Sequence, residues 1–324
     1  MSERLTWIVE AAIADKRSRA SWNDRLTHWE RPPSDHEESK IQKAAKIATD
    51  LVKKNEELVA IGVQVLPQGS YYNNTNVRLE ADMDLRVQLP TLMVRYAEGV
   101  VESDADQALG YTVVPGTLRD KAARVREVLA SDCAEAFGQH NVTVGNKAVT
   151  VDGLDGSHAD VDLVPAFHLR YVQKDSQGDY FTTDGVGLVA ADGVETWNFP
   201  DQHHSNGISK RANTSLRFKR VVRALKRLNY ELCEMGAINR RLPSFLVECL
   251  AYLVEDGYYL NDGDDRWARL VRVTSRLQVL LSDDALIKVV TEINEIKYLF
   301  HSSQAWTHRD AIAFVDAAHA RLTA

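Results

Sequence analysis

The stretch Ala81-Asp82-Met83-Asp84-Leu85-Arg86-Val87-Gln88-Leu89 alternates between polar and apolar residues from Asp82 onward. Side chains alternate between the two faces of a β-strand, so this pattern predicts a strand that is buried on one face only. Asp82 and Asp84 are then expected side by side on the polar face, together with Arg86 and Gln88. The residues expected to enter a core are Met83, Leu85, Val87 and Leu89.

The Asp82-Met83-Asp84 pair has two interpretations. Two carboxylates this close repel each other and raise each other's pKa unless a positive group lies between them. Magnesium is usually held in proteins by one or two carboxylates, with water and substrate phosphate as the remaining ligands. An isolated Asp-x-Asp is also compatible with an exposed strand edge whose acids are hydrated. Further sequence features are needed to choose between a metal site and an ordinary surface.

A candidate phosphate-binding turn lies just upstream. Gln68-Gly69-Ser70 follows a short apolar run, and a Gly-Ser pair there predicts a sharp turn. Backbone N–H groups and the Ser70 hydroxyl can then face a polyphosphate without obstruction by a side chain. Gly69-Ser70 alone is also compatible with an ordinary turn. The span between Ser70 and Asp82 is short enough for the chain to return as a strand beside its neighbour. The hydrogen-bond donors of the turn and the candidate metal-binding aspartates are then expected to lie close together.

A third acid would complete a site for two metal ions. Residues 157–167 supply two candidates, Asp160 and Asp162, which alternate with apolar residues. Both are therefore predicted on one face of a strand. Periodicity does not choose between them.

The apolar period changes along the chain. Helical spacing is found over residues 2–14 and 37–63, separated by Arg31-Pro32-Pro33-Ser34-Asp35, in which Ser34 or Asp35 can cap the second helix. Short strands and hairpins are predicted between residues 64 and 200, around a helix at 118–137. From residue 209 the helical spacing returns. Helices are predicted at 216–230, 244–254, 266–281, 284–300 and 310–321.

Composition limits the functional class. A chain of 324 residues with 44% apolar residues is long enough for two domains or one bilobed body. The net charge of -7 argues against a protein that coats long nucleic acid, so no long nucleic acid is expected as a partner. Cys133, Cys233 and Cys249 form no paired metal or disulfide spacing, which favours the cytoplasm. Neither a signal peptide nor a membrane span is expected.

Residues 210–227 contain eight basic residues and no acidic one. On a helix, Lys219, Arg223 and Lys226 fall on one face, with apolar residues opposite. Such a segment is compatible with a hydrated surface helix. A site of three acids that binds triphosphates needs counter-charge, and this segment is its densest source, which favours a nucleotide-binding face.

Other catalytic signatures are absent from the sequence. It contains no HExxH, no Cys/His quartet, no nucleophile elbow, no GxGxxG and no GxxxxGK[ST]. Zinc hydrolysis, serine hydrolysis, and Rossmann or P-loop nucleotide binding are therefore not favoured.

The motifs as a set resemble a known superfamily. Gly69-Ser70, Asp82-x-Asp84 and a distant strand aspartate followed by proline resemble the signature of polymerase-β-like nucleotidyltransferases. QGSYYNNTNVR, ADMDLRV and VDLVPAF together resemble the bacterial CD-NTases, relatives of cyclic GMP-AMP synthase and oligoadenylate synthetase. WNFPDQHHSNG, RFKRVVRALKRL and LPSFLVECL are similar to the helical C-terminal lobe of that family. The resemblance covers roughly residues 63–254.

The resemblance assigns roles residue by residue. It implies that Asp162, the acid followed by Leu-Val-Pro, is the third metal ligand and helps to remove the proton of the attacking hydroxyl, with Asp160 a neighbour on the same face. The implied catalytic and metal-binding residues are Asp82, Asp84 and Asp162. The implied nucleotide-binding residues are Gln68, Gly69, Ser70, Lys219 and Ser244.

The resemblance also implies a fold and an activity. The fold is α+β and bilobed, with a mixed-sheet catalytic lobe over residues 1–168, N-terminal helices that span both lobes, and a mainly helical lobe over residues 169–324. Two Mg²⁺ ions are the implied cofactor, with Mn²⁺ as the alternative. The implied substrates are nucleoside triphosphates, ATP and GTP foremost. The implied product, formed with release of pyrophosphate, is a cyclic di- or trinucleotide second messenger of anti-phage (CBASS) signalling that a separate effector reads.

Two other functions stay open at this stage. One is a terminal transferase, or an enzyme of the same superfamily that modifies protein or RNA. The other is a non-catalytic nucleotide- or RNA-binding regulator, against which the three intact acids argue. A C-terminal conjugation partner is also left open. The sequence does not specify the bases, the linkage or the ring size of the product.

Overall fold

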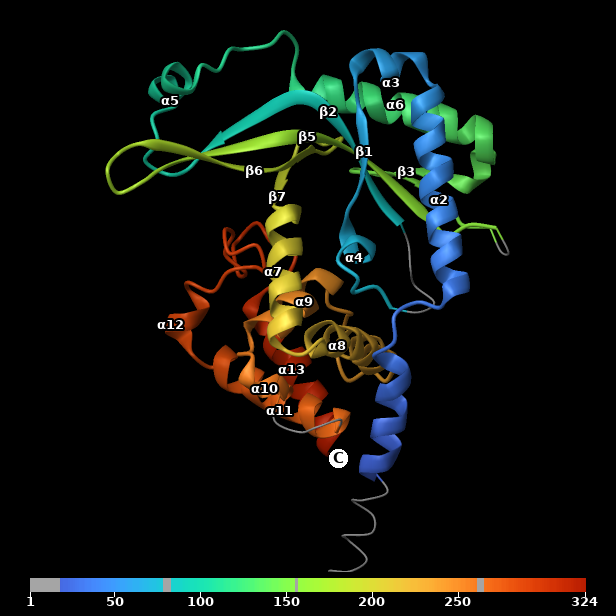
Figure 1. Cartoon of the computed structure of the whole chain (residues 1–324), viewed down its shortest axis with the longest axis vertical. Coiled ribbons are helices and arrows are strands. Elements are labelled where there is room, and N and C mark those ends of the chain that lie inside the picture. Colours follow the sequence, from blue (N-terminus) through green and yellow to red (C-terminus); the bar gives the residue numbers. More distant parts are fainter. Residues whose placement is uncertain (1–17, 78–82, 155–156, 261–264) are drawn as a thin grey trace, which may run out of the picture. The chain divides into compact units, whose positions relative to one another are not determined.

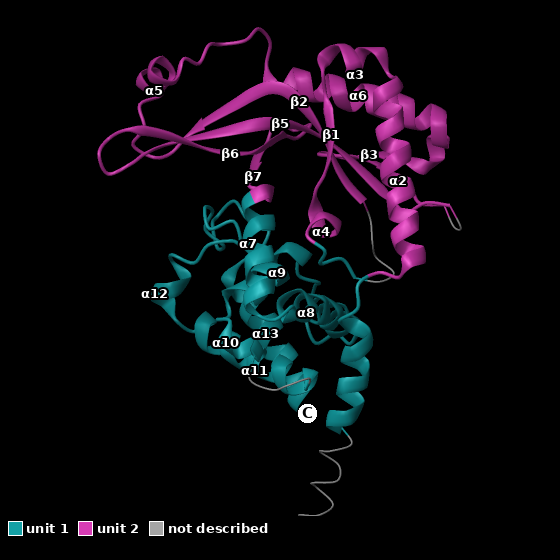
Figure 2. Cartoon of the chain, viewed as in Figure 1, with its two compact units in different colours: residues 1–32, 74–78, 202–324 teal, residues 33–73, 79–201 magenta. Residues whose placement is uncertain are grey.

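The computed structural model describes residues 18–77, 83–154, 157–260 and 265–324. The described chain divides into two compact units, coloured separately in Figure 2. The sheet unit comprises the described residues of 33–73 and 79–201, and the helical unit those of 1–32, 74–78 and 202–324. This division differs from the boundary predicted at residue 168, because that residue lies inside a long strand and the sheet continues to residue 198.

The sheet unit is built on a mixed sheet, which has seven strands in the described residues (Figure 1). Its order is β1-β2-β5-β4-β3, with β6 paired to β5 and β7 paired to β6. Among the described strands, only β2 and β5 pair in parallel, and the other pairs are antiparallel. The strands are β1 Gln64–Pro67, β2 Met83–Tyr96, β3 Val142–Val144, β4 Val149–Val151, β5 Val161–Lys174, β6 Tyr180–Val189 and β7 Glu195–Asn198.

The alternation in β2 has the predicted effect on burial. Met83, Leu85, Val87 and Leu89 are at most 2% exposed, whereas Asp84 is half-buried. Burying each such apolar side chain contributes roughly 1.5–3 kcal/mol, which strongly disfavours a shift of one residue in register. The polar face of β2 is thereby fixed.

Helices cover this sheet. They are α2 Asp35–Lys54, α3 Glu56–Ile61, α4 Gly69–Tyr72, α5 Glu102–Leu109 and α6 Leu118–Phe137, and both α2 and α6 pack against the sheet. Ser34, one of the two residues predicted as the cap, caps α2 in a capping box, and α6 spans the predicted residues. The single helix predicted over 37–63 is wrong. Asn55 is extended and its side chain accepts a hydrogen bond from Leu58 N, which ends α2 and starts α3.

The helical unit surrounds a second hydrophobic core. Residues 18–29 are helical, and the later helices are α7 Pro200–Asn213, α8 Arg217–Glu234, α9 Ser244–Leu253, α10 Gly257–Leu260, α11 Arg266–Leu281, α12 Asp284–Ile287 and α13 His308–Thr323. The helix predicted over residues 2–14 falls outside the described residues. Fully buried side chains that fill this core include Leu26, Phe218, Leu250, Tyr259 and Phe314.

The helix predicted over 284–300 is also wrong. Helix α12 ends at Ile287, and Thr291 and Tyr298 form an isolated β-bridge instead. Asn294 Oδ1 accepts from the backbone N–H groups of Ile296 and Lys297, at 2.9 and 3.0 Å. This local bonding competes with helical hydrogen bonds, so apolar spacing alone is misleading here.

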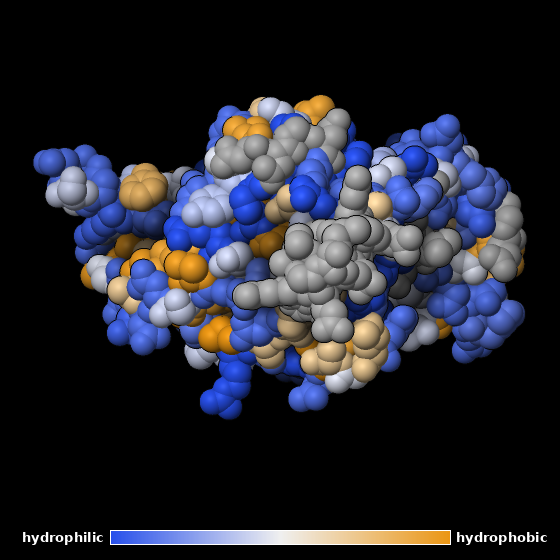
Figure 3. Space-filling model, turned by 90° about the horizontal axis from the view of Figure 1, so that it is seen from below, coloured by the Kyte–Doolittle hydropathy of each residue, from blue (hydrophilic) through white to orange (hydrophobic). Residues whose placement is uncertain are grey.

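None of the helices in the described ranges has the length and apolar character that a membrane crossing requires. On the face shown in Figure 3, hydrophilic residues predominate among those described, and the hydrophobic ones form small groups.

Candidate active site

The parallel pairing of β2 and β5 brings two of the predicted acids together. Asp84 is the direct register partner of Asp162. Neighbouring strands lie about 4.8 Å apart, and register partners project to the same face of the sheet. Both residues are half-buried. Asp82 falls outside the described residues.

The Asp162 carboxylate is oriented by the strand on its other side. Thr150, its register partner on β4, donates a hydrogen bond from Oγ1 to Asp162 Oδ1 at 2.5 Å. Among the described residues, no cation forms an ion pair with Asp162. The hydrogen bond from Thr150 therefore holds the carboxylate in a fixed position beside Asp84, as a hard oxygen ligand requires.

The structure separates Asp160 from Asp162. Asp160 precedes β5 rather than lying in it, so the prediction that both share one strand face is wrong. Its Oδ1 accepts a hydrogen bond from Gly153 N at 2.6 Å, and its carbonyl oxygen accepts from Met83 N at 2.9 Å. Asp160 thus closes the connection between β4 and β5, a structural requirement that hydrophobic alternation does not reveal.

Alanine substitutions should distinguish these two aspartates. We expect Asp162→Ala to lose at least about 1,000-fold in transferase rate, because a charged group at the reacting centre is removed. Asp160→Ala removes one hydrogen bond to the backbone and should cost about 1–2 kcal/mol in free energy of unfolding, with most activity retained. Initial rates and urea unfolding curves would measure both effects. A larger rate loss for Asp160→Ala would show that the third acid is misassigned.

The Gln68-Gly69-Ser70 turn lies directly against Asp84. Gln68 N donates to the Asp84 carbonyl oxygen at 3.0 Å, which extends the β1–β2 pairing into the turn. Gly69 has a φ of +71°, and a Cβ placed on it would lie only 1.8 Å from Asp84 Oδ2. Glycine is therefore needed twice here, for backbone conformation and for space. Ser70 follows at once and is half-buried.

Arg86 is a feature of the site that the alternation pattern does not reveal. It shares the Asp84 face of β2, yet it is only 8% exposed. Its Nε and Nη1 have no hydrogen-bond partner in the described part of the chain. Burial lowers the pKa of Arg86, while the Asp201 carboxylate acts to raise it. A buried guanidinium two residues from Asp84 places fixed positive charge on the acidic face.

The basic face of α8 is mostly buried, which corrects its interpretation as a nucleotide-binding surface. Lys226 is 2% exposed and pairs with Glu248. Arg223 donates to the carbonyl oxygens of Glu30 and Asn74, both at 2.8 Å. Lys219 is also buried, and burial together with the charge of Arg211 lowers its pKa. Lys219 and Arg223 nevertheless line a pocket, so the nucleotide contact implied for Lys219 stays a prediction.

Lys219 and Ser244 both belong to the helical unit. Lys219 lies in the first turn of α8 and lines a cavity in that unit. Ser244 is the first residue of α9 and is exposed.

The described acids fit a hard divalent cation. No group of three or more metal-ligating side chains is found among the described residues, which exclude Asp82. Asp84 and Asp162 supply half-buried carboxylate oxygens in register on adjacent strands. Oxygen donors of this kind suit magnesium or manganese better than a softer metal.

Comparisons with known proteins place the chain in a family. Residues 205–323 match the model of the cGAS/DncV-like nucleotidyltransferase C-terminal helical domain. The chain is 34% identical over 307 residues to the cyclic dipyrimidine nucleotide synthase CdnE of Legionella pneumophila, covering 91% of this chain and 95% of that protein. The chain belongs to the bacterial CD-NTases. The relatives of this family that match the chain are cyclic nucleotide synthases. This chain is therefore a nucleotidyltransferase, as the motifs imply.

Two further relatives support this assignment of the CD-NTase chain. It is 30% identical to the cyclic dipyrimidine nucleotide synthase CdnE of Cecembia lonarensis, with 90% of this chain and 95% of that protein covered. The structure of Elizabethkingia meningoseptica CdnE cyclic dinucleotide synthase with GTP and Apcpp is similar with a TM-score of 0.72 and 26% identity. That match covers 93% of this chain and 99% of the other. The predicted α+β fold is confirmed.

Proposed function

We propose that this nucleotidyltransferase condenses two nucleoside triphosphates into a cyclic dinucleotide, with pyrimidine nucleotides as substrates. The in-register pair Asp84 and Asp162 beside Gly69 is the observation that supports the chemistry. The names of the Legionella and Cecembia relatives support the choice of pyrimidines. Purine nucleotides, which the family resemblance places foremost, are the second candidate, because the Elizabethkingia structure holds GTP.

Two Mg²⁺ ions are the proposed cofactor, with Mn²⁺ as the alternative. Asp84, Asp162 and Asp82 are the proposed ligands. When bound, magnesium lowers the pKa of the attacking ribose hydroxyl and neutralises charge on the leaving pyrophosphate.

The residues of the chain have distinct tasks in this proposal. Asp162, held by Thr150, accepts the proton of the attacking hydroxyl. The Gln68-Gly69-Ser70 turn donates hydrogen bonds to the triphosphate, because backbone N–H groups bind anions well. Lys219 and Ser244 are assigned to the nucleotide by the family motifs.

The reaction is balanced as two successive transfers. In each transfer, a bond forms between a ribose oxygen and the α-phosphorus of a nucleoside triphosphate. The bond from that phosphorus to the oxygen that bridges the α- and β-phosphates breaks. The hydroxyl proton leaves through Asp162, and one pyrophosphate is released. The second transfer closes the ring. The product is proposed to act as a second messenger in anti-phage signalling in the cytoplasm, where a separate effector reads it.

Base preference can be tested by supplying nucleotides singly and in pairs. We expect UTP or CTP, alone or together, to give more cyclic dinucleotide than ATP with GTP, as measured by mass spectrometry after phosphatase treatment. Equal magnesium and enzyme concentrations in each reaction provide the control. A product made from purines alone would contradict the pyrimidine assignment while leaving the transferase chemistry in place.

A further inference from the structure

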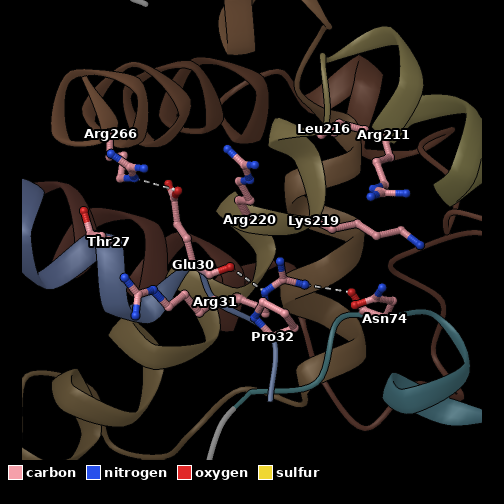
Figure 4. A pocket seen from close by; sticks show the side chains of 11 residues that line it. Thr27, Glu30, Arg31, Pro32, Asn74, Arg211, Leu216, Lys219, Arg220 and Arg266 are labelled. Atoms are coloured by element: carbon pink, nitrogen blue, oxygen red, sulfur yellow. Dashed lines mark hydrogen bonds and ion pairs between the residues drawn. The ribbon is translucent and has the colours of Figure 1, made fainter. Parts of the chain in front are cut away.

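A cationic pocket lies wholly within the helical unit, beside the start of α8 (Figure 4). Its volume is about 360 Å³, within the range of small-molecule sites. The side chains come from the end of the helical segment 18–29, from the loop at Asn74, and from α7, α8 and α11. The cations that line it are Arg31, Arg211, Lys219, Arg220, Arg223 and Arg266.

The positive charge of the pocket is not balanced by its own carboxylate. Glu30 is the acidic residue in the lining. Its Oε2 accepts a hydrogen bond from Arg266 Nε at 3.0 Å, and its Oε1 lies 3.5 Å from Arg269 Nη1. These two arginines already neutralise Glu30. Arg31, Arg211 and Arg220 form no ion pair with any residue that the structure describes.

The remaining cations act on one another. Arg223 donates to the carbonyl oxygens of Glu30 and Asn74, which are neutral acceptors, and it forms no ion pair with a carboxylate among the described residues. Burial lowers the pKa of Arg223 to about 10; the charge of Glu30 acts to raise this pKa, and the charges of Arg220 and Arg211 act to lower it further. A multivalent anion in the pocket would relieve this repulsion.

The backbone adds to this field. Helix α8 has 18 residues, and its N-cap, Leu216, is in the left-handed region at a φ of +67°; the Thr214 hydroxyl accepts a hydrogen bond from Phe218 N at 3.0 Å. Leu216 also lines the pocket. The N-terminus of α8, which carries a partial positive charge, therefore lies at the wall of the pocket.

We propose that this pocket binds an oligophosphate chain, either inorganic or carried by a nucleotide, with Arg31, Arg211 and Arg220 as ligands beside Lys219. A guanidinium group can donate two parallel hydrogen bonds to phosphate oxygens. Cations on several walls of the pocket suit several linked phosphates better than a single phosphate. A concave pocket in a protein of net charge -7 does not suit long nucleic acid. The inference rests on the proposed function, which assigns Lys219 to the nucleotide. It adds an anion-binding site in which the arginines bind the phosphates without a metal-binding carboxylate or a divalent ion.

Calorimetric titration of the full chain with sodium tripolyphosphate in EDTA tests the proposal. We expect saturable binding, weakened about tenfold or more by Arg220→Gln and by Arg211→Gln, because each removes hydrogen bonds to a charged ligand. Arg220→Lys should restore part of the affinity. Arg309→Gln, an exposed arginine on α13, is the matched control and should change the affinity less than twofold.

The outcomes separate this proposal from the proposed function. Asp84→Asn should bind tripolyphosphate like the wild type even if it makes no product. Tighter binding of UTP or ATP than of tripolyphosphate would identify a nucleotide as the source of the phosphates, and the opposite order an inorganic chain. Equal binding of citrate, absence of binding, or unchanged affinity in folded Arg211→Gln and Arg220→Gln would overturn the proposal, whatever the synthase activity.

Discussion

Gly69→Ala is expected to lower the turnover number by about 100-fold or more. The new Cβ would lie 1.8 Å from Asp84 Oδ2, whereas real Cβ contacts are essentially never closer than 3.0 Å. Either the turn or the carboxylate must therefore move by about 1 Å or more, and a displacement of that size in a reacting group costs about 100-fold in rate. The φ of +71° adds about 1 kcal/mol of backbone strain for alanine.

Gly62→Ala is the matched control for this substitution. Gly62 also has a positive φ, +80°, but a Cβ there would meet nothing within 4 Å. Both variants should lose a similar amount of stability through backbone strain, and only Gly69→Ala should lose activity. Steady-state rates with thermal melts would separate the two effects. A Gly69→Ala protein with wild-type turnover would show that contact between the turn and Asp84 is irrelevant to the chemistry.

Lys226→Met should destabilise the folded chain by about 3–5 kcal/mol. Lys226 Nζ lies 2.5 Å from Glu248 Oε1, and both side chains are at most 5% exposed. Thr75 Oγ1 donates to the same oxygen at 2.6 Å, and Lys226 also donates to the Thr75 carbonyl at 3.0 Å. Removing one member of a buried pair leaves the other charge uncompensated, which is a large penalty. Urea unfolding at pH 7 measures it.

Acid titration gives a second test of the same pair. Burial by itself would raise the pKa of Glu248, but Lys226 and His203 hold it down, to about 2. Since this folded-state pKa lies below the ordinary 4.5, the pair stabilises the protein above pH 4.5, and this contribution is lost as the pH falls toward 2. In Lys226→Met, burial is no longer opposed by Lys226 and the acid dependence of this contribution should weaken or reverse.

A surface ion pair provides the control for Lys226→Met. Lys46 and Asp50 pair at 2.6 Å on α2, with side chains 73% and 44% exposed. Lys46→Met should change the free energy of unfolding by less than about 1 kcal/mol. Equal effects of the two substitutions would contradict the assignment of Lys226 to a buried network.

Apolar spacing and capping residues predicted those strands and helix ends that depend on residues close together in the sequence. The alternation around Met83 and Leu85 fixes β2, and the Ser34 cap fixes the start of α2. The alternation in β5 predicts the face on which Asp162 lies, but the parallel register that sets Asp162 opposite Asp84 is a long-range pairing that the alternation does not specify. The observed boundary between residues 201 and 202 was not recoverable in this way, and the predicted one at residue 168 falls inside β5, which is longer than its apolar alternation indicates.

Other features depend on contacts between residues far apart in the sequence. Helical spacing places Lys226 on a basic face, but Glu248 and Thr75 pair with it inside the helical unit. Arg86 shares the polar face of β2, yet neighbouring elements bury it. Asp160 has the alternation of a strand residue, but its bond to Gly153 closes a loop. Periodicity reports the face on which a residue lies and not the element that covers that face.

The most direct test of the central claim is the fate of α-³²P-labelled nucleotide after incubation with magnesium and then phosphatase. Wild-type protein should yield phosphatase-resistant label that mass spectrometry identifies as a cyclic dinucleotide, and Asp84→Asn and Asp162→Asn should yield none above background. Label released entirely as inorganic phosphate by the wild type, or resistant product that persists in either variant, would contradict synthesis at the paired aspartates.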